Sequence, residues 1–348
     1  MTPTRYALAL ALALAACLAI AGCGGPQPAA DAPAARTRLP AKFVADRVVL
    51  VPTTASGQVL ELMTDSGGGS DQLSEAAVAR LRLPTEPADI PGLREELGEA
   101  ADGTRLARFP AFAEGQGIPD VRFLDGRLMV FPEAFVRQQT PPGLTRYDGF
   151  LGHRWFADRT WTWDYAGEAF YREPAAFQPD PDARAMPLGF LTSALGKRVF
   201  SMPRMTVRVD GRELPMLLDT GATTVLTPEA LAVLGDGGPA ERATSMVADN
   251  VFRAWRAAHP EWRVIEGGQA FSGADMIEVP EVEIAGFTVG PVWFTHRPDA
   301  NFHDMMSSMM DAQVEGAIGG NAFRHFVMTV DYPAAVAYFR PARTPGQP

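Results

Sequence analysis

The sequence predicts a mainly β protein with short helices, built as two similar lobes related by a pseudo-two-fold axis. Three observations predict this fold class. Apolar stretches rich in β-branched residues alternate with glycine-containing turns. Helical periodicity is confined to short pieces. The same series of short motifs also occurs twice in the same order, which is the pattern of a duplicated domain.

The N-terminus has the pattern of a targeting segment, which stands outside the fold. Arg5 precedes an apolar run at residues 6–21, and residues 20–23 read IAGC. Small residues before a cysteine resemble the cleavage site of a bacterial lipoprotein, so residues 1–22 are expected to be a signal peptide and Cys23 the lipidated residue. The alternative is an uncleaved membrane anchor, for which the apolar run is short.

A lipid on Cys23 would hold the mature chain on the periplasmic face of a bacterial membrane. Gly24 follows the cysteine, and the absence of Asp at that position favours the outer membrane, by resemblance to proteobacterial sorting. Residues 24–42 are rich in Pro and Ala, so a flexible tether is expected up to residue 43. The lipid is the only membrane contact expected.

Cysteine usage and charge exclude several functions. Cys17 lies inside the signal and Cys23 is the anchor, so no cysteine remains for a disulfide, a metal site or a thiol nucleophile. Without Arg5 the net charge is 30 − 41 = −11, which argues against a nucleic-acid partner. The five histidines have no recognised ligand spacing, so neither a metal nor another cofactor is expected.

An internal repeat begins with two similar segments. Residues 58–83 and 212–235 each contain an apolar strand, an Asp-Ser/Thr-Gly turn and a helix-like stretch. Asp65 begins the turn of the first copy and Asp219 that of the second. Ser74 and Thr227 occupy the positions where helix N-caps are expected.

Three further pairs of motifs follow in the same order. They are IPDV at 118–121 with VPEV at 279–282, DGFLG at 148–152 with EGAIG at 315–319, and Asp164-Tyr165 with Asp331-Tyr332. The offset rises from 154 at the first Asp to 161 and then 167, as insertions in surface loops would cause. Turn chemistry common to all-β chains is the alternative explanation, but it does not account for the matching Asp-Tyr pairs.

Local patterns predict individual elements in each copy. Strands are expected at 48–51 and 205–209. The Pro-containing motifs are each expected to lead into two strands joined by a turn, at Gly126 or Gly286. The expected helices are 74–81, 228–234, 248–258 and 302–312.

The expected organisation is a monomer with both lobes in one chain. From the N-terminus it comprises a signal peptide (1–22), a lipid-anchored tether (23–43), an N-terminal lobe (44–175), an inter-lobe linker (176–189), a C-terminal lobe (190–342) and a tail (343–348). Each lobe has the length of an ordinary domain.

The segment around Asp219 resembles the active-site turn of aspartic peptidases. An apolar strand precedes DTGAT at 219–223, and AIG at 317–319 resembles the second signature of each lobe in that family. Residues 319–332 are similar to the end of a retropepsin-like domain. The resemblance covers nearly all of 44–342, and it implies a bilobal pepsin/retropepsin-like fold in a bacterial lipoprotein.

The resemblance implies that Asp65 and Asp219 form a catalytic pair that activates water to hydrolyse a peptide bond. Two carboxyl groups held close together share one proton, so that one can act as a base and the other as an acid. The protein is therefore expected to be an aspartic endopeptidase, acting on a peptide or protein substrate in the bacterial envelope.

The resemblance also implies roles for the neighbours of the pair. The supporting residues are Ser66, Gly67, Thr220, Gly221 and Thr223. The hydroxyls of Ser66 and Thr220 would hydrogen-bond across the lobe junction, and the glycines would let backbone approach the carboxylates. Thr223 would hold the outer oxygen of Asp219.

Two alternatives remain open for the function. The first copy reads DSGGGS and carries glycine where the second copy has Thr223, which motivates a catalytically inactive lipoprotein that binds envelope peptides or proteins. DSGG also resembles the nucleophile segment of chymotrypsin-like serine peptidases, but no histidine precedes His153 to serve as the base.

Two further clusters have structural interpretations. Gly267, Gly268 and Gly273 indicate a flap hairpin over the second lobe rather than a phosphate-binding loop. The methionines at 305, 306, 309 and 310 are expected on the buried side of a short helix, although they could also line an apolar substrate surface.

Overall fold

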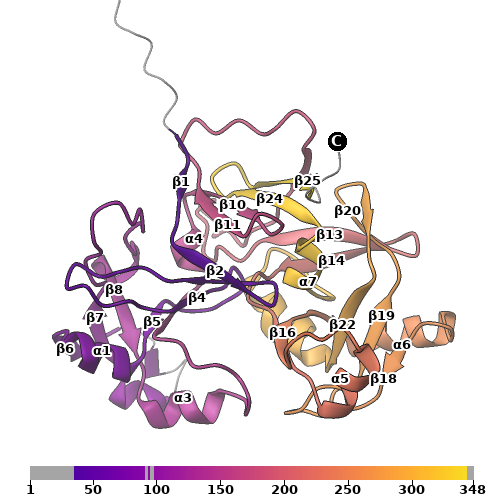
Figure 1. The fold of residues 1–348 in the computed structure, drawn as a ribbon, viewed down its shortest axis with the longest axis horizontal. Coiled ribbons are helices and arrows are strands. Elements are labelled where there is room, and N and C mark those ends of the chain that lie inside the picture. Colours follow the sequence, from indigo (N-terminus) through magenta and orange to yellow (C-terminus); the bar gives the residue numbers. More distant parts are fainter. Residues whose placement is uncertain (1–34, 91–92, 95–97, 343–348) are drawn as a thin grey trace, which may run out of the picture. The chain divides into compact units, whose positions relative to one another are not determined.

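The computed structural model describes residues 35–90, 93–94 and 98–342, which belong to one compact unit (Figure 1). The expectations for the signal peptide, for Cys23 and for the tail at 343–348 fall outside the described residues. Within those residues, no helix has both the length and the apolar character needed to cross a membrane.

The first lobe is built on an eight-stranded sheet. In spatial order its strands are β2 (Ala41–Val44), β3 (Arg47–Leu50), β4 (Leu62–Thr64), β9 (Gly149–Leu151), β5 (Gln72–Leu73), β8 (Arg127–Val130), β7 (Arg105–Arg108) and β6 (Thr85–Pro87). β4 and β9 run parallel at the centre. The strand expected at 48–51 is β3, all of whose residues are buried.

The second lobe has a nine-stranded sheet. In order its strands are β18 (Val264–Ile265), β19 (Met276–Val279), β22 (Val292–Arg297), β17 (Ser245–Ala248), β23 (Gly316–Ile318), β14 (Arg212–Leu218), β13 (Arg204–Val209), β20 (Val282–Ile284) and β21 (Phe287–Val289). β14 and β23 run parallel, as β4 and β9 do. The seven neighbouring strands from β3 to β6 in the first sheet correspond, one by one, to the seven from β13 to β18 in the second. The two sheets therefore share one topology.

A third sheet joins the lobes. Its six strands, in order, are β1 (Thr37–Arg38), β11 (Ala169–Arg172), β10 (Thr160–Asp164), β24 (Phe326–Asp331), β25 (Val336–Pro341) and β12 (Arg184–Pro187). Thr162 pairs with Thr329, its partner at the repeat offset of 167, and their hydroxyls are 2.7 Å apart. This antiparallel pair marks the pseudo-two-fold axis. Asp164 and Asp331 each accept a backbone N–H in the following turn, so both have a structural role at the end of a strand.

Short helices cover the sheets. The α-helices are α1 (Glu75–Leu81), α3 (Glu133–Gln139), α4 (His153–Phe156), α5 (Pro228–Leu234), α6 (Asp249–Ala258) and α7 (Gly320–Phe323), with 3-10 turns at η1 (Gly98–Gly103), η2 (Phe123–Asp125) and η4 (Ser307–Met309) and a π-helix at η3 (Asn301–Met306). Ser74 and Thr227 cap α1 and α5 as predicted, each side-chain oxygen accepting a backbone N–H three residues on.

The strand registers correct the way the two copies align. Gln72 pairs with Phe150, and Met246 pairs with Ala317, the counterpart of Phe150 in the repeat. The interval from the Asp of the Asp-Ser/Thr-Gly turn is 7 residues in the first lobe (72 − 65) and 27 in the second (246 − 219). The counterpart of α1 is therefore α6, not α5, and the second lobe carries 20 additional residues. They lie within residues 223–244, called the insert below, which contains β15 (Thr223–Val225), α5 and β16 (Glu241–Ala243).

Four local expectations also need correction. The tether was predicted to reach residue 43, but β1 and β2 pair with strands of the fold. The linker at 176–189 contains β12, which hydrogen-bonds to β25. Two strands were expected after each Pro-containing motif. The motif at 118–121 is followed instead by η2 and a single strand, β8, whereas the motif at 279–282 leads into β20 and β21. A single helix was expected at 302–312, but η3 and η4 occupy this segment.

Candidate active site

The two Asp-Ser/Thr-Gly turns meet between the lobes. Each follows the central parallel pair of its sheet: the N–H of Asp65 donates to Leu151 O, and that of Asp219 donates to Ile318 O, both at 2.9 Å. Within each turn the glycine N–H donates to the Asp carboxylate two residues earlier, from Gly67 at 2.8 Å and Gly221 at 3.0 Å. The structure therefore brings Asp65 and Asp219 together in equivalent environments.

Ser66 and Thr220 lock the two turns to each other. The Ser66 hydroxyl donates to Leu218 O at 2.7 Å and accepts the Thr220 N–H at 3.0 Å. In return the Thr220 hydroxyl oxygen accepts the Ser66 N–H at 3.1 Å. Both side chains are fully buried. The expected hydrogen bonding across the lobe junction is present, and the serine-nucleophile alternative is wrong because Ser66 is enclosed and engaged.

Gly67 and Gly221 are required by close contact with the opposite carboxylate. A Cβ on Gly221 would lie 2.2 Å from Asp65 Cγ, and one on Gly67 would lie 2.9 Å from Asp219 Cγ. Carbon atoms normally approach no closer than about 3.5 Å. Any side chain here would push one carboxyl group away from the other.

The two carboxyl groups form one hydrogen-bonded unit. Asp65 and Asp219 hydrogen-bond to each other. Burial raises the pKa of both, and for Asp219 the negative charge of Asp65 raises the pKa further, well above its usual range. For Asp65, the hydrogen bonds from Asp219 and from backbone N–H groups oppose the effect of burial on the pKa. The pair therefore holds one proton, which its two carboxyl groups share.

Thr223 does not play the role expected of it. Its hydroxyl donates to Gly221 O at 2.7 Å, so it braces the turn instead of holding the outer oxygen of Asp219. The counterpart by position is Gly69, which is exposed, and a Cβ there would meet nothing within 4 Å. A Cβ on Gly68, by contrast, would lie 2.3 Å from the ring of Phe150, which covers this turn.

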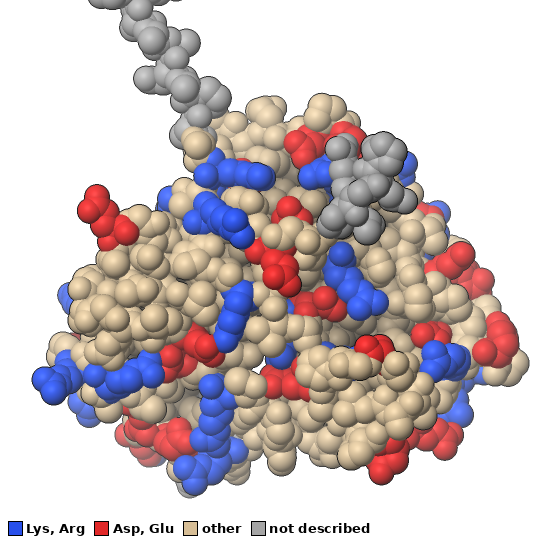
Figure 2. Space-filling model, in the orientation of Figure 1, with Lys and Arg blue, Asp and Glu red and all other residues tan. Residues whose placement is uncertain are grey.

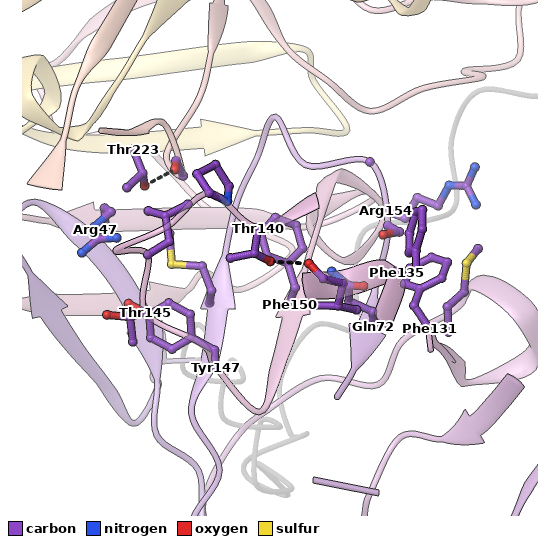
Figure 3. Close-up of a pocket in the computed structure, with 18 of the residues that line it drawn as sticks. Arg47, Gln72, Phe131, Phe135, Thr140, Thr145, Tyr147, Phe150, Arg154 and Thr223 are labelled. Carbon is purple, nitrogen blue, oxygen red and sulfur yellow. Dashed lines mark hydrogen bonds between the residues drawn. The ribbon is translucent and has the colours of Figure 1, made fainter. Parts of the chain in front are cut away.

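A pocket of about 750 Å³ adjoins the pair on the side of the first lobe. It reaches the active-site turns at Ser70 and Gly221, although the two Asp side chains are not in its wall. Phe150 lies between its two ends, with Arg47, Thr145 and Tyr147 at one end and Phe131, Phe135 and Arg154 at the other (Figure 3). Most of the lining side chains are apolar and only partly buried, as in many ligand sites.

The equivalent position in the second lobe is filled. The counterparts of Met63, Gln72, Tyr147 and Phe150 are Leu217, Met246, Val314 and Ala317, which pack with Phe302, Met306, Met309 and Met310 in an apolar cluster. The methionine segment thus supplies core side chains, except for Met305, which is 56 % exposed. Sequence reasoning missed this asymmetry because the side chains that fill the second-lobe position come from a distant segment, residues 302–310.

Asp71 is a buried acid that the sequence did not single out. One oxygen of its carboxyl accepts the Gly152 N–H at 2.8 Å. At the equivalent place in the second lobe, the Ser245 hydroxyl oxygen accepts the Gly319 N–H. Its other oxygen has no hydrogen-bond partner. Burial raises the pKa of Asp71 to about 7. No sequence signal identifies it, because its counterpart in the repeat is a serine.

Two remaining expectations concern metals and the flap. Among the described residues, no group of three His, Cys, Asp or Glu side chains is placed to hold a metal ion. The glycines at 267, 268 and 273 lie in the loop between β18 and β19, which hydrogen-bonds to the insert through Thr227 N–H to Gly268 O and Ala270 N–H to Val225 O.

Comparison with known proteins finds no family and only distant structural similarity. No protein-family model matches the chain, and no curated protein matches it. Similar solved structures include an aspartic proteinase from Irpex lacteus, 10 % identical, with 90 % of this chain and 99 % of that chain covered at a TM-score of 0.47. The basic 7S globulin from soybean is 9 % identical, with 90 % of this chain and 98 % of that chain covered at a TM-score of 0.45. Conglutin gamma from lupine seeds is 10 % identical, with 88 % of this chain and 95 % of that chain covered at a TM-score of 0.46.

The architecture is mainly β and bilobal, as the sequence predicted. The similarity is distant, and the structures found include both a proteinase and two 7S globulins. The question of activity therefore depends on the site of this chain itself.

Proposed function

We propose that the protein is an aspartic endopeptidase that hydrolyses peptide bonds with Asp65 and Asp219. The observation that carries this proposal is the hydrogen-bonded carboxyl pair, with the pKa of Asp219 raised by burial and by Asp65. Perturbed titration of paired acids at a lobe junction is typical of catalytic sites. The reciprocal Ser66–Thr220 hydrogen bonds support it, because they hold the pair in one geometry.

The pair can supply both proton transfers of the reaction. In the singly protonated state, the Asp65 carboxylate takes a proton from water as the water oxygen bonds to the peptide carbonyl carbon. Asp219 gives its proton to the carbonyl oxygen. When the C–N bond breaks, Asp65 passes its proton to the nitrogen and Asp219 regains one from the diol, so the pair returns to its starting state.

The pocket indicates what the substrate presents to this pair. Its wall includes Met63, Phe123, Met129, Phe135 and Phe150, so it suits a large apolar side chain next to the scissile bond. Burial of one such side chain contributes about 1.5–3 kcal/mol. Acidic and basic side chains are interspersed on the face shown in Figure 2, and no large patch of one sign lies on it.

Incubation with a mixture of denatured proteins and peptides tests the proposal. Cleavage by the wild-type protein, blocked by a statine-type transition-state mimic and absent in Asp219→Asn, is the expected result. Binding of the mimic without any cleavage would replace the proposal with the peptide-binding alternative, which the open Gly69 position in the first turn motivates. Cleavage that persists in Asp219→Asn would place the chemistry elsewhere.

The bacterial envelope is the proposed place of action, on the strength of the IAGC sequence at 20–23. In this proposal a lipid on Cys23 anchors the protein to the periplasmic face of the outer membrane. Cys23→Ala is expected to lose the anchor and to leave the detergent-soluble membrane fraction. If that variant fractionates like wild type, the lipid anchor is excluded.

A further inference from the structure

The insert of the second lobe reaches across to the first lobe beside the active site. Ala243 N–H donates to Ala45 O at 2.9 Å. Glu241 carries the main contacts: one carboxylate oxygen lies 2.5 Å from Arg47 Nη1, and the other accepts the Thr145 N–H at 3.0 Å and its hydroxyl at 2.5 Å. The set of Arg47, Thr145 and Glu241 is called the latch below.

The ion pair within the latch, between Arg47 and Glu241, is largely buried. The side chain of Arg47 is 2 % exposed and that of Glu241 is 13 % exposed. Burial disfavours the carboxylate, but the hydrogen bonds from Thr145 and Arg47 outweigh this effect and lower the pKa of Glu241. Removing one partner alone would leave the other charge enclosed and unpaired, so the two residues are best substituted together.

Val225, which pairs with Glu241 between β15 and β16, also contacts the first lobe. Gly143, in the first-lobe segment that follows α3, lies against Val225 of β15, and a Cβ at Gly143 would be 3.1 Å from Val225 Cγ1. The two lobes are thus in contact at Glu241 and at Val225, the residue paired with it.

The latch forms one end of the substrate pocket. Arg47, Thr145 and Glu241 are all in its wall, as are Gly221 and Thr223 of the second active-site turn. In Figure 3, Arg47 and Thr145 lie at the same end of the pocket as Thr223, away from Phe131 and Arg154. A peptide whose side chain fills the pocket therefore meets a closed wall at this end.

We propose that the latch restricts the enzyme to short peptides and chain ends, with Glu241 as the specificity-determining residue. This proposal rests on the proposed peptidase function and narrows its substrate class. A peptide extended past the latch on one side of the scissile bond collides with residues 143–145 and the insert. Extension on the opposite side meets no such wall.

The test uses a set of peptides that share one scissile bond and are lengthened on one side or the other. Arg47→Ala/Glu241→Ala opens the latch, because it removes the side chains that join the lobes and takes away both charges together, so that neither is left buried and unpaired. The matched control is Arg204→Ala/Asp311→Ala, which removes a partly exposed pair in the second lobe outside the pocket.

Wild type is expected to lose at least tenfold in kcat/KM when the peptide is lengthened on one side only. The opened variant is expected to recover that loss, whereas the control variant is not. Equal tolerance of both extensions in wild type, or an unchanged length preference in the opened variant, overturns the proposal.

A reversible lock gives an independent arm. The Cβ position at Gly143 is 3.9 Å from Val225 Cβ, within the range that a disulfide spans. Gly143→Cys/Val225→Cys, oxidised, is expected to keep wild-type activity on short peptides, and Gly143→Cys alone controls for the strain of a side chain at φ +88°. If oxidation abolishes cleavage of the short peptides, the latch must open for every substrate and the length-selection proposal is wrong.

A failure of the peptidase function itself is distinguishable. If wild type cleaves no peptide, the same variants are tested by calorimetry with statine-type ligands lengthened on either side. Weaker binding of ligands lengthened on one side, relieved at least tenfold in the opened variant, would support the latch even though catalysis had failed. Length-independent binding would overturn the latch as well.

Discussion

Gly221→Ala is the substitution that tests the geometry of the active site most sharply. The new Cβ would lie 2.2 Å from Asp65 Cγ and 2.5 Å from its Oδ2. Since normal contact begins at about 3.5 Å, the Asp65 carboxyl must retreat by about 1.3 Å or the turn must shift. Overpacking of this kind costs about 1–3 kcal/mol of folding free energy.

The expected effect on catalysis is larger than the effect on stability. A misplacement of about 1 Å in a reacting group lowers the rate by about 100-fold, so kcat of Gly221→Ala on a peptide substrate should fall at least that far. The melting temperature should fall by only a few degrees. Steady-state kinetics and thermal unfolding measure the two effects separately.

Matched glycines in the same two turns control for the loss of backbone freedom. Gly67→Ala should have a smaller effect on kcat than Gly221→Ala, because its Cβ would lie 2.9 Å from Asp219 Cγ. Gly69→Ala should behave like wild type, because a Cβ there meets nothing within 4 Å. Wild-type turnover by Gly221→Ala, or equal losses in all three variants, would refute the reasoning from contact distances.

Three further predictions concern neighbouring residues. Ser66→Ala should destabilise the protein by about 1–3 kcal/mol, measured by denaturant unfolding, because Leu218 O and the Thr220 N–H lose a buried partner; Ser66→Thr keeps the hydroxyl and should lose less. Thr223→Ala should lower kcat only a few-fold, since its hydroxyl braces Gly221 O and not a carboxylate; a loss comparable to that of Gly221→Ala would contradict this. The pKa of Asp71 is raised to about 7 in the folded state, so its contribution to stability is complete below the unfolded pKa of about 4 and is lost as pH rises through 7. Melting temperatures measured from pH 4 to 8 should therefore fall less in Asp71→Asn than in wild type, and parallel curves would exclude this titration.

Much of the fold could be predicted because the repeat consists of short motifs whose structures are determined by neighbouring residues. The two Asp-Ser/Thr-Gly turns, the caps at Ser74 and Thr227 and the strand before each turn depend on neighbouring residues, and the structure shows all of them. The same local similarity misaligned the copies. A capped helix follows each turn, so α5 was taken as the counterpart of α1, and only the strand registers identify α6 instead.

The rest of the site depends on contacts between distant parts of the chain. Arg47 and Glu241 are 194 residues apart, and neither belongs to a recognisable motif. The pocket and its filled counterpart differ through the path of residues 301–310, whose apolar side chains pack against Leu217, Met246 and Ala317 in the second lobe. The supporting role of Thr223 was transferred from a resemblance, and the structure assigns its hydroxyl to a backbone carbonyl.

The central claim is that Asp65 and Asp219 act as one catalytic unit. The most direct test compares kcat for cleavage of one peptide by wild type, Asp65→Asn, Asp219→Asn and the double variant, with unfolding curves to confirm that all four are folded. Each single substitution removes one of the two carboxyl groups that share the proton, so each should abolish cleavage. The double variant should be no worse than either single one. If Asp65→Asn retains wild-type turnover, or if the two losses multiply in the double variant, the pair does not act as a unit.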